Sequence, residues 1–245
     1  MRLKDKIAII TGGARGIGQA VSELFAKEGA TVIIMDLLPQ GQAVADGIKV
    51  SGGKAEYHSV SVTDKAAVEG ILAKVNEKYG KIDILINNAG ITRDRTLEKM
   101  SEAEWDAVID VNLKGVFLCT QAVVPYMKAN KYGRIVSAAS NVGLRGNFGQ
   151  TNYAATKAGV IAMAKTWTVE FGKHGITANA IAPGFTMTDM VKEIPEEHFD
   201  AIKASIPLRT VAQPLDIAYG YLYLASDEAR FVSGICLTID GGTSR

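Results

Sequence analysis

Seven short apolar runs, each separated from the next by a helical pattern, limit the possible folds most strongly. The runs occupy residues 6–11, 31–36, 55–62, 82–87, 133–140, 176–183 and 235–240. Most of them are apolar on both faces, which is typical of strands in a parallel sheet that helices cover on both sides. The helical patterns occupy residues 16–28, 39–51, 64–79, 101–128, 151–172 and 213–225. This alternation predicts right-handed βαβ crossovers and a doubly wound α/β fold with a seven-stranded parallel sheet.

The chain of 245 residues suits one large domain, because no linker, low-complexity tract or short repeat separates the predicted elements. One long irregular stretch, residues 185–212, lies between the sixth strand and the helix that follows it. Loops of this length inside a compact fold usually have a function. We therefore expect a single domain over residues 1–245, with residues 185–212 acting as a lid over a substrate.

Charge and composition exclude several classes of protein. The formal net charge is +1, which gives no basic footprint for nucleic acid. No apolar run approaches twenty residues, so neither a membrane span nor a signal peptide is expected. The two cysteines lie in apolar surroundings and indicate buried free thiols in a reducing, cytoplasmic compartment. The three histidines are scattered through the chain, so no metal site is expected.

A glycine-rich turn follows the first predicted strand and opens the first helix. It places Gly12, Gly16 and Gly18 inside a βαβ unit of about thirty residues. Glycines without side chains let the backbone approach a pyrophosphate, whose negative charge the N–H groups at the helix start favour. We therefore predict a Rossmann-type dinucleotide site in which Arg15 and Ile17 of the same turn take part.

The second predicted strand ends at Asp36, where an acidic residue can accept hydrogen bonds from the ribose hydroxyls of adenosine. Its charge would repel the 2′-phosphate of NADP, and Leu37 and Leu38 supply no base in its place. Arg15 in the glycine turn could instead pair with that phosphate. The balance favours NAD, and NADP remains the alternative.

Tyr153 and Lys157 are four positions apart in a predicted helix, so their side chains are neighbours on one face. A tyrosine has a pKa near 10, too high for a base at neutral pH, and a nearby cation favours the phenolate. We therefore predict that Lys157 lowers the pKa of Tyr153. Ser140 ends the fifth strand, at the sheet edge where ligands bind in open parallel sheets, and its hydroxyl could hold a substrate oxygen beside Tyr153.

Several motifs in a fixed order resemble the classical short-chain dehydrogenase/reductases. They are "TGGARGIG" from residue 11, "NNAG" at 87–90, Asn112, Ser140, Tyr153-x-x-x-Lys157 and "PG" at 183–184. The resemblance covers residues 4 to 243. It implies seven strands in the order 3-2-1-4-5-6-7 and an enzyme that commonly forms homotetramers through its two long helices and the C-terminal strand region.

The resemblance also implies roles for individual residues. Asn112, Ser140, Tyr153 and Lys157 would form the catalytic group, in which Asn112 bends its helix and holds a water that contacts Lys157. Lys157 would also hold the nicotinamide ribose. The remaining cofactor contacts would come from Val62 at the adenine, from Asn88 and Gly90 after the fourth strand, and from Pro183, Gly184, Thr186 and Thr188 at the nicotinamide.

Within the family, "AGITRDRTLEKM" and "PGFTMTDM" look most like the 3-oxoacyl-[acyl-carrier-protein] reductases. Two residues depart from the expected pattern. Asp36 favours NAD, whereas those reductases usually prefer NADPH. Ser61 stands where the family often has an aspartate. The substrate would then be a 3-oxoacyl thioester. Acyl-carrier protein, which is acidic, would be a possible partner and would bind a basic rim around the substrate pocket. Candidate rim residues are Arg93, Arg95, Lys128, Lys131 and Lys173. The alternatives are an NAD-linked dehydrogenase of a small or cyclic secondary alcohol or diol, and a nucleotide-binding regulator without turnover.

Overall fold

The computed structural model describes residues 1–188 and 196–244. Its centre is a sheet of seven strands in the order β3-β2-β1-β4-β5-β6-β7, and every neighbouring pair is parallel. This order confirms the predicted topology. The strands are β1 (Ile7–Thr11), β2 (Thr31–Asp36), β3 (Lys54–Ser59), β4 (Ile84–Asn87), β5 (Gly133–Ala138), β6 (Ile176–Pro183) and β7 (Cys236–Ile239).

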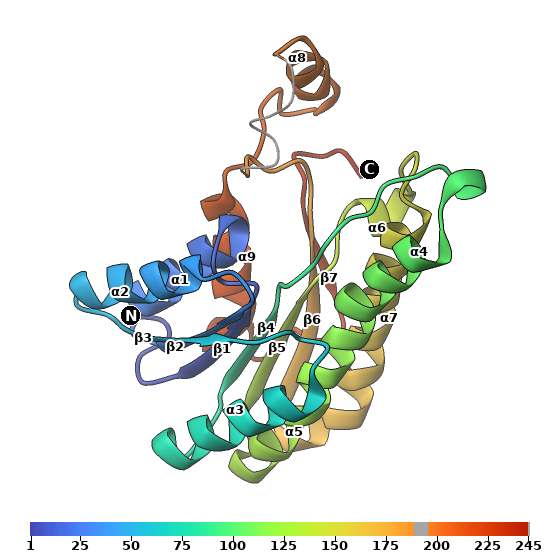
Figure 1. Cartoon of the computed structure of the whole chain (residues 1–245). Coiled ribbons are helices and arrows are strands. Elements are labelled where there is room, and N and C mark those ends of the chain that lie inside the picture. The colour runs from blue at the N-terminus through green and yellow to red at the C-terminus, as the bar shows by residue number, and fades with distance from the viewer. Residues whose placement is uncertain (189–195, 245) are drawn as a thin grey trace.

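Helices cover both faces of this sheet (Figure 1). One layer contains α1, α2 and α9, and the other contains α3, α4, α5 and α7, while α8 stands above the carboxyl ends of the strands. Each layer has its own apolar core against the sheet. The helices are α1 (Gly16–Lys27), α2 (Gln40–Val50), α3 (Lys65–Tyr79), α4 (Glu102–Ile109), α5 (Gly115–Asn130), α6 (Val142–Arg145), α7 (Thr151–Phe171), α8 (Glu196–Ser205) and α9 (Pro214–Ala225).

Local sequence signals account for most element boundaries. All five residues of β1 are buried, as expected for a strand between two helix layers. Asp64 accepts a hydrogen bond from the backbone N–H of Ala67 and so caps α3. Ser101 and Glu104 form a reciprocal capping box at the start of α4. These caps satisfy N–H groups that a helix start leaves without partners.

The structure differs from the predicted elements in a few places. β3 ends at Ser59, three residues before the expected end at 62. The single helix expected over 101–128 is divided by a π-turn, Asp110–Lys114. The short helix α6 and the helix α8 inside the predicted lid were not expected. Cys119 is buried as predicted, whereas Cys236 is only half-buried because β7 forms the edge of the sheet.

The helical run Glu102–Asn130 is long and apolar enough to cross a membrane by length and composition alone. Half of its most apolar window is buried inside the protein. Its second part, α5, packs against β4, β5 and α3. The run therefore has the surroundings of a core helix.

The strand order reverses direction between β1 and β4. From β1 the chain proceeds outward to β2 and β3, and it then crosses back to start β4 on the other side of β1. Loops that leave such a switch point diverge and create a crevice at the carboxyl ends of the strands. The fold therefore places the glycine turn after β1 and the "NNAG" segment after β4 on the two walls of one crevice.

Candidate active site

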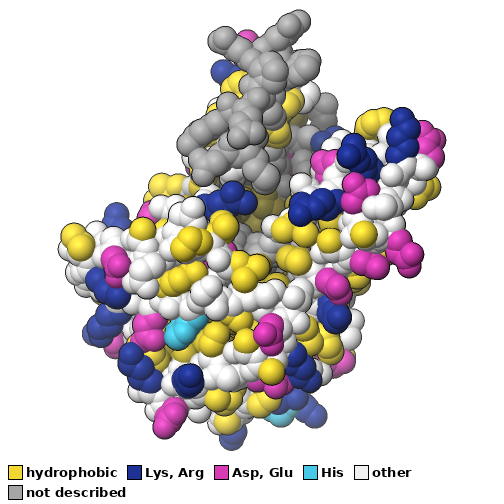
Figure 2. Space-filling model, in the orientation of Figure 1, with side chains coloured by type: hydrophobic (Ala, Val, Ile, Leu, Met, Phe, Trp, Pro, Cys, Tyr) yellow, Lys and Arg dark blue, Asp and Glu magenta, His cyan; other side chains and the backbone are white. Residues whose placement is uncertain are grey.

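A cleft of about 950 Å³ opens above the switch point, between the sheet and the segment that carries α8. The space-filling view shows this hollow, with Lys and Arg side chains on both sides of its mouth (Figure 2). Every residue predicted for catalysis or cofactor binding lines the cleft except Asn112, which is buried behind it. The predicted residues therefore come together although they lie on six different strand ends and two helices.

The glycine turn approaches its neighbours too closely for any side chain. A Cβ atom on Gly18 would lie 2.0 Å from the carbonyl oxygen of Gly12, and one on Gly12 would lie 2.7 Å from the Cα of Ala89. Gly12 and Gly16 also have positive φ angles of 66° and 55°. The residue before α1, Arg15, makes no side-chain cap, and the first turn of α1 holds no acidic residue. The helix start therefore presents backbone N–H groups to the cleft, as an anion site requires.

The segment after β4 braces this turn. The side-chain amide of Asn88 donates to the carbonyl oxygens of Thr11 and Gly12 at 3.2 and 2.9 Å. The hydroxyl of Thr11 accepts from the backbone N–H groups of Asn88 and Ala89. These bonds hold the ends of β1 and β4 at a fixed separation, so Asn88 braces the two strand ends.

Asp36 is held rigidly at the end of β2. One carboxylate oxygen accepts from the N–H of Ala14 and the other from the N–H of Leu38, both at 3.0 Å. Asp36 lines the cleft beside the exposed side chain of Leu37. Val62 lines the same end, and Ser61 is engaged with Thr63 in a local turn. This end of the cleft therefore carries a fixed negative charge and an apolar wall.

Asn112 lies at the centre of the π-turn between α4 and α5 and is fully buried. Its side-chain oxygen accepts from the N–H of Ile91, and its amide donates to the Ile91 carbonyl, each at 2.8 Å. π-turns are rare and often occur at functional sites. A Cβ on Gly90 would lie 3.3 Å from the Asn112 oxygen and 3.7 Å from Lys157 Nζ, so Gly90 separates these two groups.

Ser140, Tyr153 and Lys157 share one wall of the cleft. Lys157 is buried, and its Nζ donates to the carbonyl oxygen of Ala138 at 2.6 Å and lies 5.4 Å from the centre of the Tyr153 ring. The hydroxyl of Ser140 accepts from the N–H of Val142 at 3.1 Å, and Ser140 lines the cleft together with Tyr153. The geometry thus places a hydroxyl, a phenol and an ammonium group next to one another.

The predicted lowering of the Tyr153 pKa is wrong for the protein alone. Burial of the phenol raises the pKa of Tyr153, and this outweighs the hydrogen bond from Ser140, which lowers it; Asp94 raises it further. Burial also lowers the pKa of Lys157 from 10.5 to about 8. The four-residue spacing reveals the neighbouring charge, whereas the loss of solvent around both groups depends on the tertiary fold.

The segment after β6 forms the far wall. A Cβ on Gly184 would lie 2.6 Å from the Cα of Asp240, so this glycine allows β6 and the C-terminal segment to meet. The hydroxyl of Thr186 donates to the carbonyl of Gly184 at 3.0 Å, which leaves it free only as an acceptor. The side chain of Thr188 lies 3.5 Å from the position of a Cβ on Gly16, over the glycine turn.

Arg145, Tyr221 and Thr243 are among the residues that line the cleft but were not predicted from the sequence. Arg145 ends α6, whose existence no pattern indicated. Tyr221 lies in the middle of α9, where an apolar helix face indicates only a core position. Among residues 1–188 and 196–244 there is no group of three side chains suited to hold a metal ion.

The doubly wound sheet, the glycine turn and the tyrosine–lysine pair define a dinucleotide-binding oxidoreductase. The comparisons agree: residues 12–244 match the family model described as enoyl-(acyl carrier protein) reductase. The chain belongs to this family of short-chain dehydrogenase/reductases, which act on CH–OH groups with a nicotinamide cofactor.

Similar proteins cover the whole chain. The 3-oxoacyl-[acyl-carrier-protein] reductase FabG of Thermotoga maritima is 49% identical over 99% of both chains. A (2S)-[(R)-hydroxy(phenyl)methyl]succinyl-CoA dehydrogenase subunit, BbsD, of Thauera aromatica is 42% identical over 100% of this chain and 98% of the relative. Among solved structures, levodione reductase superposes with a TM-score of 0.95 at 33% identity over 99% of each chain.

Proposed function

We propose that the protein is a cytoplasmic, NADH-dependent reductase that converts a 3-oxoacyl thioester to the 3-hydroxyacyl thioester. The observation that carries this proposal is the shared wall of Ser140, Tyr153 and Lys157 in a cleft built on a dinucleotide turn. FabG relatives at 40–49% identity over almost the whole chain support the substrate class. The free thiols of both cysteines support a reducing compartment.

The cleft fits a nicotinamide dinucleotide along its length, and the bound dinucleotide would supply the hydride. The N–H groups of the turn around Gly12, Gly16, Ile17 and Gly18 would hold the pyrophosphate. Asp36 would accept from the adenosine ribose and Val62 would pack at the adenine. Asn88 and Gly90 would shape the middle of the cleft. Lys157 would bind the second ribose, and the segment with Pro183, Gly184, Thr186 and Thr188 would bind the nicotinamide.

The protein's own groups then manage the proton. In the reducing direction, the carbonyl oxygen gains negative charge and needs a proton donor. The raised pKa of Tyr153 keeps its phenol protonated at neutral pH, which suits a donor. Ser140 would hold the same oxygen, and Lys157 would stabilise the phenolate left behind. Asn112 would hold a water that returns a proton toward Lys157.

The cleft favours a thioester over a small alcohol as substrate. Arg93 and Arg145 line it, are exposed, and have no carboxylate partner among the residues that the structure describes. Arg95, by contrast, pairs with Glu104 at 3.3 Å. Two unpaired guanidinium groups near the mouth suit the phosphates that accompany a pantetheine thioester. An NAD-linked dehydrogenase of a small or cyclic alcohol would need a more enclosed cleft.

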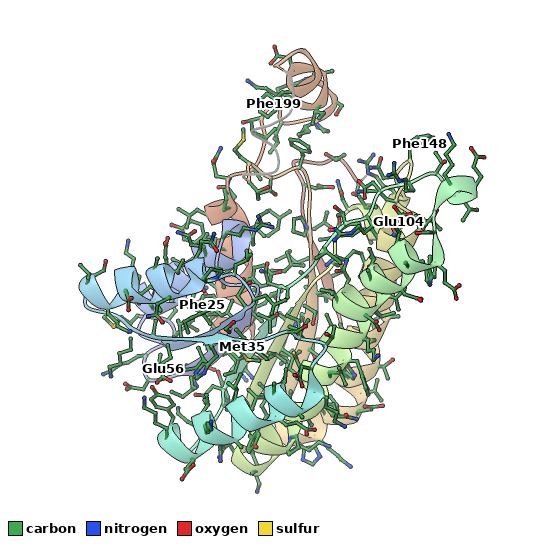
Figure 3. All side chains as sticks on the ribbon, in the orientation of Figure 1. Phe25, Met35, Glu56, Glu104, Phe148 and Phe199 are labelled. Atoms are coloured by element: carbon green, nitrogen blue, oxygen red, sulfur yellow. The ribbon has the colours of Figure 1, made fainter. Side chains whose placement is uncertain are left out.

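We also propose that residues 185–212 cover the acyl chain. The ends of this segment are tied together, since the N–H of Met187 donates to the carbonyl of Ala212 and that of Ala212 donates to Phe185. The rings of Phe185 and Phe199 lie 6.4 Å apart and hold α8 above the cleft. Phe199 and Phe148 lie on opposite sides above the sheet (Figure 3). Residues 189–195 of the predicted lid, which include Met190 and Ile194, lie outside the described residues.

A substrate panel tests this function. Acetoacetyl-CoA, small ketones and cyclic diketones should be compared with NADH and with NADPH through the absorbance of reduced nicotinamide. We expect acetoacetyl-CoA to give the highest kcat/KM. Faster turnover of a cyclic ketone would favour the alcohol dehydrogenase, and no turnover of any carbonyl with either cofactor would favour a regulator.

The preference for NADH should depend on Asp36. We expect wild type to prefer NADH, and Asp36→Ala to reduce the ratio of the kcat/KM for NADH to that for NADPH by about tenfold or more, or about 1.4 kcal/mol, because the Asp36 carboxylate repels the 2′-phosphate of NADPH. Arg15→Ala is the matched variant and should affect NADPH more than NADH. A wild type that clearly prefers NADPH would show that Arg15, not Asp36, governs the choice.

We propose that the protein forms a homotetramer through two apolar faces. One is a groove between α5 and α7, which includes Phe117, Trp167 and Phe171. The other joins α9 to β7, where Tyr219, Tyr223, Phe231 and Ile235 are exposed. Exposed apolar patches mark interaction sites, and two different self-complementary faces produce a tetramer with three twofold axes.

Breaking one face should leave dimers. Phe117→Asp places a charge in the α5–α7 groove, so we expect the mass in solution to fall from four chains to two, as measured by light scattering after size exclusion. Leu97→Asp is the control, since Leu97 is 71% exposed and lies outside both faces. A monomeric wild type, or a tetramer unchanged by Phe117→Asp, would contradict this assembly.

A further inference from the structure

Tyr221 is a core residue, but packing in the core does not explain why it carries a hydroxyl. The residue lies in the middle of α9 with 0% of its surface exposed, and it packs in the apolar core beneath one face of the sheet. Its oxygen has no hydrogen-bond partner among the residues that the structure describes. Buried hydroxyls are normally satisfied, and an unsatisfied one destabilises the protein. A phenylalanine would fill the same space without this cost.

The position of this side chain points to the cleft. Seven buried side-chain atoms lack a partner among the described residues, and they belong to His58, Asn87, Thr96, Arg134, Thr177, Tyr221 and Ser244. Of these seven residues, Tyr221 is the one that lines the cleft. An unpaired donor just beneath the floor of a ligand cleft differs from one deep inside the core, because a small shift of the cleft lining brings a ligand or an ordered water within its reach.

The packing of α9 indicates which end of the cleft lies above Tyr221. This helix contacts β5, β6 and β7, whose carboxyl ends lead to Ser140 and to Pro183–Gly184. Tyr221 and Tyr153 line the same cleft, and burial raises the pKa of Tyr221, which the charge of a Tyr153 phenolate raises further. The adenosine end, at β2 and β3, lies on the other side of the switch point.

We propose that the Tyr221 hydroxyl is a positioning group for the nicotinamide half of the dinucleotide, which it binds directly or through one ordered water. This inference rests on the proposed dinucleotide site and adds a contact from beneath the floor of the cleft. Because the hydroxyl is covered in the free protein, the bond forms only when the seated dinucleotide shifts the side chains that cover it. Tyr221 thus makes the free protein less stable and the complex tighter.

Tyr221→Phe separates these two effects. We expect the melting temperature of the cofactor-free variant to equal or exceed that of wild type, since the unpaired hydroxyl is removed. We expect the Kd for NADH, measured by nicotinamide fluorescence, to rise about five- to tenfold, as for loss of one hydrogen bond. The Kd for ADP-ribose, which lacks the nicotinamide, should not change. Tyr126→Phe, which removes a hydroxyl from a tyrosine of α5 outside the cleft, is the control.

Three results would overturn the proposal. An unchanged Kd for NADH would show that the hydroxyl serves only the core. Equal losses of affinity for NADH and ADP-ribose would place its action on the whole site and not on the nicotinamide half. A marked fall in the melting temperature of the cofactor-free variant would reveal a structural partner. None of these measurements requires turnover, so failure of the reductase proposal is detected separately by the substrate panel.

Discussion

Tyr153→Phe should lower turnover of the thioester by about 10²–10⁴-fold, the usual contribution of a general acid. The variant removes one oxygen atom from a ring that lines the cleft beside Ser140 and Lys157. The ring itself remains, so the shape of the dinucleotide site is kept. We therefore expect the Kd for NADH to stay within about threefold of wild type, well below the 1.4 kcal/mol that a tenfold change represents.

Two measurements define this result. Steady-state oxidation of NADH with acetoacetyl-CoA reports turnover, and nicotinamide fluorescence without substrate reports binding. Tyr126→Phe is the control, because Tyr126 lies on α5 outside the cleft and should keep full activity. A Tyr153→Phe variant with wild-type turnover would remove Tyr153 as the proton donor. A variant that loses NADH binding to the same extent would make the residue part of the binding site alone.

Lys157→Met should affect activity and stability in opposite directions. We expect turnover to fall by about a hundredfold or more, because the variant loses the ammonium group that holds a ribose and stabilises a phenolate. The free protein should become more stable relative to wild type below pH 8. Burial lowers the Lys157 pKa from 10.5 to about 8, which means that the charged lysine destabilises the folded protein by about 3 kcal/mol. The lost hydrogen bond to Ala138 reduces the observed gain.

The pH dependence of this difference has a definite sign. Between pH 8 and 10.5 the lysine is protonated in the unfolded chain and neutral in the folded one. The unfolded state then binds more protons, so the stability of wild type rises with pH, while Lys157→Met lacks this contribution. The difference in free energy of unfolding by which Lys157→Met exceeds wild type should therefore shrink by about 3 kcal/mol from pH 7.5 to 10.5.

Urea unfolding at several pH values measures this directly. Lys165→Met, at an exposed position of the same helix, is the control and should show no such dependence. A difference between Lys157→Met and wild type that stays constant with pH would mean that Lys157 bears no burial penalty. A Lys157→Met variant with normal turnover would remove it from the proposed chemistry.

Local patterns in the sequence predicted most of the fold. The apolar run at 31–36 became β2 without change, and the run at 176–183 became β6 with the same ends. Buried parallel strands leave a continuous apolar signal that depends little on their neighbours. Asn112 is a poor residue for the interior of a helix, and the π-turn at its position explains the predicted bend.

Properties that depend on tertiary burial could not be predicted. The spacing of Tyr153 and Lys157 correctly placed them together, but the direction of the Tyr153 pKa shift follows from desolvation by segments distant in sequence. Arg145 enters the cleft because a four-residue helix turns it there, and such short helices leave no periodic signal. In the sequence, Tyr221 is indistinguishable from the other apolar residues of α9, and only the structure shows that its buried hydroxyl has no partner within residues 1–188 and 196–244.

The central claim is that Tyr153 and Ser140 together hold the reacting oxygen beside a dinucleotide. A crystal structure of the protein with the oxidised dinucleotide and an unreactive 3-oxoacyl thioester analogue measures this geometry. The account predicts that the 3-oxo oxygen lies within hydrogen-bond distance of both Tyr153 Oη and Ser140 Oγ. A phenol turned away from the dinucleotide, or a dinucleotide that leaves no room for the analogue beside it, would contradict the account.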